Sequence, residues 1–138
     1  MTNKDPEEST MHGASRTHLA EQLSRRVLTV NLDAEMAELW KGIQPEGSGR
    51  AAKTLVKHPD LRVTLIAIRG GIQITEHEVS GRVSIQCLKG KVTLHVQDKA
   101  LDLSAGQILA LDRDMRHDVA AAEDSVLLVT VAQIVREE

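Results

Sequence analysis

Short runs in which apolar residues alternate with polar ones fill the chain from Arg50 onward. These runs are rich in Val, Ile and Leu, and turn signals such as Gly70-Gly71 and Lys89-Gly90 separate them. Many short strands at this spacing are typical of an antiparallel sandwich or barrel, so the pattern predicts an all-β domain. The predicted strands are AKTLVK (52–57), LRVTLIAI (61–68), IQITEHEV (72–79), RVSIQCL (82–88), KVTLHVQ (91–97), ALDL (100–103), QILALD (107–112), HDVAA (117–121) and SVLLVTVAQIV (125–135).

The part of the chain before this domain has a different pattern, which predicts a flexible tail followed by a short, partly helical arm. Asp33 is the expected N-cap of the second helical segment of the arm. The expected organisation is a tail over 1–18, an arm over 19–49 and a β-barrel over 50–138. Within the arm we expect a helix over 18–25, a strand over 27–32, helical turns over 33–40 and a loop over 41–50.

Composition narrows the class of protein. The chain has 138 residues, which suits one domain with one core, and its single cysteine excludes an internal disulfide. A cytoplasmic location is therefore expected. The net charge of −3 and the presence of one aromatic residue, Trp40, argue against nucleic-acid binding, which needs a basic face or stacking platforms. The sequence contains neither a basic amphipathic helix nor a long apolar run, so we expect no membrane partner.

Glycines and histidines stand at regular intervals among the predicted strands. Gly71 is followed by His77 and then by Gly90, and a second series begins at Gly106 and reaches His117. Both series occur in the order and at the separation of the two sequence motifs of the cupin superfamily, and the chain resembles that family from about Arg50 to Val131. The resemblance implies a double-stranded β-helix, also called a jelly-roll barrel, similar to the small RmlC-like cupins.

Several motif positions hold residues that differ from the family pattern. Val79 stands at the second histidine position and Val83 at the glutamate position. Asp112 and Asp114 replace the proline and glycine of the second motif, and Ala121 replaces its asparagine. Asp enters the left-handed region of backbone space more readily than most residues, so Asp114 is compatible with the expected turn.

The family's metal site is only half preserved. The resemblance implies three histidines and one glutamate around a divalent metal such as Fe, Mn, Ni or Zn, and here His77 and His117 remain. Valine has no lone pair, and tight sites usually hold at least three protein ligands. The sequence therefore leaves two alternatives open. In one, His77 and His117 hold a metal together with water or one further donor. In the other, the barrel holds no metal.

Strand alternation predicts which side chains share the barrel interior with the two histidines. His77, Val83 and Cys87 have the same parity, which makes Cys87 either a soft third ligand or a small buried hydrophobic residue. Gln73 and Thr75 share this parity and are expected to line the mouth of the barrel. The candidate ligand-binding residues are His77, His117, Gln73, Thr75 and Cys87.

Two functions from different classes are compatible with these residues. One is a binding module that holds a small, mostly apolar molecule beside His77 and His117. The alternative is a metal-dependent cupin enzyme of the dioxygenase, isomerase or decarboxylase type, with His77 and His117 as metal ligands. Whether the chain is an enzyme is left open. The resemblance also implies a homodimer, in which residues 27–32 pair with a sheet edge of the second copy.

Overall fold

The computed structural model describes residues 27–44, 46–75 and 80–133. The chain divides into two compact units, Met1–Glu35 and Met36–Glu138. The helix predicted over 18–25 lies outside the described residues. In the described part, nine strands and one helix account for the regular structure, and no helix there is long and apolar enough to cross a membrane.

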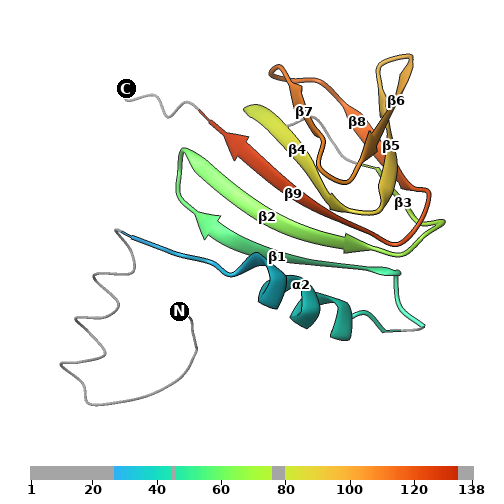
Figure 1. The fold of residues 1–138 in the computed structure, drawn as a ribbon. Helices are drawn as coiled ribbons and strands as arrows, with labels where there is room; N and C mark the ends of the chain where they lie inside the picture. Colours follow the sequence, from blue (N-terminus) through green and yellow to red (C-terminus); the bar gives the residue numbers. More distant parts are fainter. Residues whose placement is uncertain (1–26, 45, 76–79, 134–138) are drawn as a thin grey trace. The chain divides into compact units, whose positions relative to one another are not determined.

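The strands form two antiparallel sheets, which confirms the all-β prediction (Figure 1). One sheet has five strands in the order β1-β2-β9-β4-β7, and the other has four in the order β3-β8-β5-β6. All nine observed strands lie at the predicted runs. Their bounds are β1 (Arg50–Lys57), β2 (Leu61–Ile68), β3 (Gln73–Thr75), β4 (Arg82–Lys89), β5 (Lys91–Val96), β6 (Lys99–Ser104), β7 (Ile108–Leu111), β8 (His117–Ala121) and β9 (Ser125–Ala132).

The register of the five-stranded sheet places interior-facing residues in transverse rows across β2, β9 and β4. Paired residues of neighbouring strands point to the same face, so each row lies at one depth along the barrel. The first row contains Arg62, Val131 and Val83; the second contains Thr64, Val129 and Ile85; the third contains Ile66, Leu127 and Cys87.

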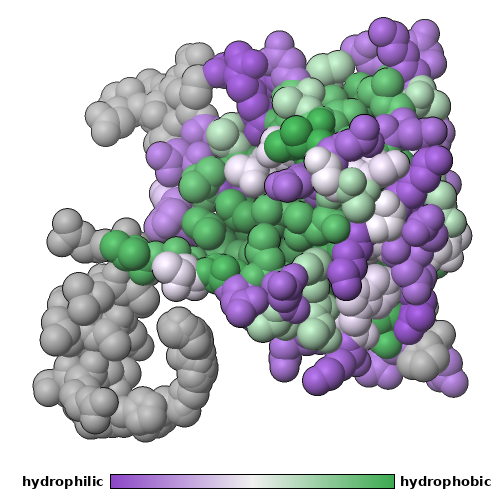
Figure 2. All heavy atoms as spheres, viewed as in Figure 1, coloured by the Kyte–Doolittle hydropathy of each residue, from purple (hydrophilic) through white to green (hydrophobic). Residues whose placement is uncertain are grey.

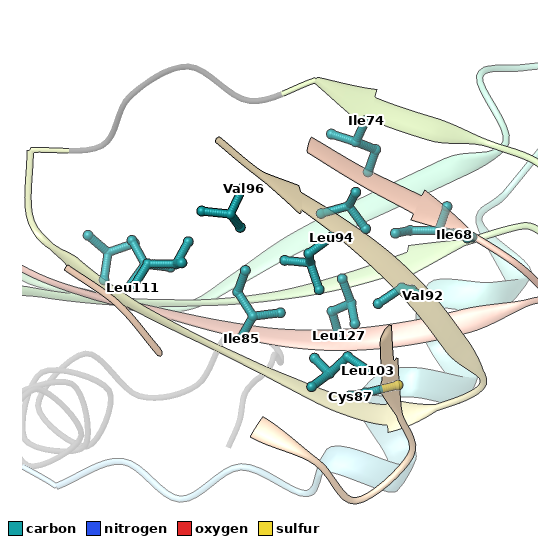
Figure 3. Packing of buried hydrophobic residues seen from close by; sticks show 14 residues of the cluster. Ile68, Ile74, Ile85, Cys87, Val92, Leu94, Val96, Leu103, Leu111 and Leu127 are labelled. Carbon is teal, nitrogen blue, oxygen red and sulfur yellow. The ribbon is translucent and has the colours of Figure 1, made fainter. Parts of the chain in front are cut away.

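Buried residues form two apolar clusters, one on each face of the five-stranded sheet. The interior cluster lies between the two sheets and includes Ile85, Leu94 and Leu127 (Figure 3). The outer cluster contains Leu65 and Ala67 of β2, which alternate with interior-facing Ile66 and Ile68. A strand buried on both faces reads as a nearly continuous apolar run, and LRVTLIAI has that pattern.

Helix α2 (Leu32–Lys41) confirms the prediction of helical turns over 33–40. Its N-cap is Asn31, whose side-chain oxygen accepts a hydrogen bond from the Ala34 amide at 3.1 Å, so Asp33 belongs to the first turn instead. Met36 of α2 is buried in the outer cluster, together with Ile43 just beyond the helix. The part of the helix from Met36 onward thereby covers the outside of the barrel.

The strand predicted over 27–32 is not observed. Residues 27–31 have no regular secondary structure, and Leu32 already belongs to α2. A β-branched run becomes a strand only where another strand satisfies its backbone, and no described strand pairs with this segment. Pairing with the sheet of a second copy, and the homodimer itself, stay predictions.

The turns of the two motifs have the backbone conformation expected for them. Gly71, Gly90 and Gly106 all have positive φ, between 83° and 92°. Asp114 also has positive φ, at 61°, which confirms that aspartate adopts the left-handed conformation at this position. The motif turns are thus present where the sequence places them.

Candidate functional site

The candidate functional site is a cavity of about 300 Å³ inside the barrel. Its wall is mostly aliphatic, and Figure 2 shows apolar side chains gathered over β2, β4 and β9 on the face in view. Most of the wall comes from the three transverse rows of the five-stranded sheet, and Ile74, His117 and Val119 come from the other sheet. The lining residues are Thr54, Arg62, Thr64, Ile66, Ile74, Val83, Ile85, His117, Val119, Leu127, Val129 and Val131.

His117 is the buried polar group of this cavity. It is the first residue of β8, pairs in register with Val96 of β5, and is 5% exposed. Its Nδ1 lies 3.4 Å from the carbonyl oxygen of Met115, which can only accept a hydrogen bond. A hydrogen bond at this contact requires the tautomer with the proton on Nδ1, in which Nε2 is an acceptor. The sequence identified this residue correctly as one that lines the barrel interior.

Val83 occupies the position of the motif glutamate and lines the same cavity as His117. It is buried, and Val131 and Leu111 flank it on the neighbouring strands. Ala121, at the motif asparagine position, is also buried in the interior cluster. The structure therefore places methyl groups at two positions where the family pattern has polar side chains.

The described residues do not fit a divalent metal. Among the described lining residues, His117 is the single imidazole, and none has a carboxylate or a thiol. No group of three or more His, Cys, Asp or Glu that could hold a metal occurs within residues 27–44, 46–75 and 80–133. His77 and Val79 lie outside the described residues, so the pairing of His77 with His117 stays a prediction.

Cys87 faces the interior, as its parity predicts, but it does not line the cavity. Its side chain is 0% exposed and is packed in the interior cluster; Figure 3 shows it close to Leu103. The thiol donates to the carbonyl oxygens of Lys89 at 3.2 Å and Gly90 at 3.5 Å. Burial raises the pKa of the Cys87 thiol, which disfavours the thiolate needed for metal binding. These observations favour the buried hydrophobic alternative.

Gln73 and Thr75 do not have the orientation expected from the sequence. Both are exposed, while Ile74 between them is buried and lines the cavity. Ile74 is paired with Val119 of β8, whose side chain also points inward, and this pairing sets the parity of β3. The expectation counted alternation back from His77, which lies outside the described residues, and it is wrong for both Gln73 and Thr75. A contact of either residue with a ligand stays a prediction.

Three polar residues of the wall were missed in the sequence. Thr54 lies on β1, and Arg62 and Thr64 lie on β2. Both faces of β2 are apolar, so the alternation in LRVTLIAI did not show which face is interior. The structure places Ile66 and Ile68 inside, and residues 62 and 64 share their parity. Trp40, in contrast, belongs to the outer cluster, with the Arg69 guanidinium carbon 6.0 Å from its ring centroid.

Solved structures of other proteins have the same fold. A cupin superfamily protein from Desulfitobacterium hafniense aligns with a TM-score of 0.62 and 17% identity over 67% of this chain and 84% of that one. A conserved protein of unknown function from Streptococcus pyogenes aligns with a TM-score of 0.63 and 19% identity over 80% and 90%. An RmlC-like cupin from Shewanella frigidimarina gives 0.59 and 17% over 67% and 83%. No family model and no curated protein matches the sequence.

The two sheets, their strand order and these structural neighbours show that the chain has the fold of the small cupins. The chain therefore has the RmlC-like jelly-roll fold that its two motifs predict. Sequence identities of this size establish the fold alone. The chemistry of the site has to be inferred from the residues that line the cavity of this chain.

Proposed function

We propose that this cupin domain is a binding protein that holds a small, mostly apolar molecule in the barrel beside His117. The observation that carries the proposal is the composition of the cavity wall, in which eight aliphatic residues surround one buried histidine. Ligand sites usually combine an apolar wall with few polar groups, and a cavity of about 300 Å³ is at the small end of their range.

His117 gives such a ligand a defined orientation. A neutral imidazole with Nδ1 directed at Met115 leaves Nε2 to accept a hydrogen bond from a hydroxyl or amide group. The aliphatic residues contribute affinity through burial of apolar surface, at about 25 cal/mol per Å². A polar atom on the ligand also satisfies the buried imidazole, which favours one binding orientation over others.

The first test is titration calorimetry with n-hexanol, which has one hydroxyl and a flexible apolar chain. We expect His117→Leu to weaken hexanol binding about tenfold, because the hydroxyl loses its hydrogen-bond partner in a dry site. The matched control is His95→Leu, since His95 is exposed on β5 and does not line the cavity. Equal affinities of the wild type and His117→Leu for hexanol, or no binding by the wild type, would overturn the proposal.

A metal-dependent enzyme is the competing function, and elemental analysis of the untagged protein separates the two. We expect well below one transition metal per chain after exposure to Fe, Mn, Ni and Zn, because Val79 and Val83 stand at two of the four ligand positions and contribute no donor atom. About one metal per chain that is lost in His117→Ala and kept in His95→Ala would contradict this expectation. That result would favour a cupin-type dioxygenase, isomerase or decarboxylase.

A further inference from the structure

The interior face of β2 changes steadily from polar to apolar along the barrel. Arg62 at one end is exposed, Thr64 and Ile66 are half-buried, and Ile68 at the other end is fully buried. The Arg62 end of the cavity is therefore its mouth, and the Ile68 end is its floor. Thr54 adds a second hydroxyl near the mouth, because β1 pairs Thr54 directly with Thr64.

Arg62 is the only charged residue among the described residues that line the cavity, apart from the titratable His117. In register it pairs with Lys57 on β1 and with Val131 on β9, so one neighbour adds positive charge and the other is apolar. Asp60 lies in the same β1–β2 turn, yet within the described residues the guanidinium of Arg62 has neither an ion pair nor a hydrogen bond. Its guanidinium is available to a ligand.

A second, smaller cavity of about 170 Å³ adjoins the mouth at the β1–β2 turn. Arg62 lines both cavities, and Lys57 and His58 line the smaller one. No acidic residue is among the described residues that line either space. Positive charge is thus concentrated at the mouth, while the interior of the barrel is aliphatic, and this distribution suits an amphipathic anion.

We propose that the ligand of this cavity is a small carboxylate with an apolar chain, and that Arg62 binds its carboxylate at the mouth. The planar guanidinium matches a carboxylate in two parallel hydrogen bonds, and one arginine balances one negative charge. The chain of the ligand enters along Thr64, Ile66 and Val129 toward the aliphatic floor. This proposal rests on the proposed function and names the class of ligand.

Burial explains why the carboxylate stays at Arg62 and does not reach His117. A charged group keeps part of its hydration beside an exposed arginine, whereas His117 is buried and lies among aliphatic side chains. A neutral hydroxyl, by contrast, loses little on entering and gains the hydrogen bond of the imidazole. Hexanoate is therefore expected to contact Arg62 and n-hexanol to contact His117, and these different polar contacts make them separable probes.

The experiment measures the dissociation constants of hexanoate and n-hexanol for the wild type, Arg62→Gln and Arg116→Gln. We expect Arg62→Gln to weaken hexanoate about tenfold and n-hexanol less than about twofold, since the lost contact is a charge-assisted hydrogen bond. Arg116→Gln is the matched control, because Arg116 is exposed beside His117 and does not line the cavity. Arg62→Lys should restore part of the affinity through its charge alone.

The outcomes distinguish the two proposals. Failure of the wild type to bind either probe overturns the proposed function and this inference together. Binding of n-hexanol with hexanoate affinity unchanged in Arg62→Gln, or lowered equally by Arg116→Gln, overturns the inference alone. Raised salt should also weaken hexanoate and leave n-hexanol unaffected, because an exposed charge pair is screened.

Discussion

Gly90→Ala is expected to lower the free energy of unfolding by about 3 kcal/mol or more. Gly90 has φ of 83°, a conformation that already costs an L-residue about 1–2 kcal/mol. A methyl group there would also overlap the Asp124 carbonyl oxygen and the Ser125 hydroxyl, and it would lie 2.8 Å from the Ser125 Cα. These are mostly backbone atoms, so the turn itself must move to admit the methyl group.

The cost is increased by what Ser125 does in the native structure. Its hydroxyl is fully buried, donates to the Glu123 carbonyl at 2.7 Å and accepts from the Lys91 amide at 3.0 Å. Displacing this side chain leaves buried backbone groups without partners. Because Lys91 begins β5 and Ser125 begins β9, the change weakens the connection between the two sheets.

Gly106→Ala separates backbone strain from overlap. Gly106 has φ of 92°, but an added methyl group would meet nothing within 4 Å. We expect this variant to lose only about 1–2 kcal/mol, measured by urea denaturation alongside the wild type. If Gly90→Ala is as stable as Gly106→Ala, the atoms around Gly90 move aside without a free-energy cost. That result would contradict this prediction.

The strands were predictable because their signal is local. Alternation in RVSIQCL is sufficient to place Val83, Ile85 and Cys87 on one face, and the structure buries all three. The motif glycines likewise report a backbone requirement that acts at a single residue. The prediction of a strand over 27–32 was wrong because strand formation there depends on a distant partner. A strand exists only with a partner, and composition does not show whether a partner is available.

The candidate site was only partly predictable, because it is assembled from both sheets. His117 was recovered from its motif position, and Val83 was recognised as a residue without a donor atom. The orientation of Gln73 and Thr75 depends on the pairing of β3 with β8, which a count along one strand does not contain. Arg62 was missed because no motif marks it, and its place at the mouth follows from the register of three strands.

Leu94→Ala is expected to be the most damaging truncation in the interior cluster, with a loss of about 3–5 kcal/mol. Leu94 lies on β5, is 0% exposed, and is paired in register with Val119 and Leu101. Removing its side chain forfeits apolar burial and leaves a void that strands held on both sides cannot close. A domain of this size has a total stability of about 5–15 kcal/mol, so the loss is a large share of it.

Leu101→Ala is the matched control for this truncation. Leu101 lies directly opposite Leu94 on β6 and undergoes the same chemical change, yet it is 38% exposed because β6 is an edge strand. We expect it to lose only about 1 kcal/mol in urea denaturation, because solvent already reaches the site. If Leu94→Ala is too unstable to study, Leu94→Val removes one methylene and should cost about 1 kcal/mol. Similar losses in Leu94→Ala and Leu101→Ala would mean that the described core does not decide the stability of the barrel.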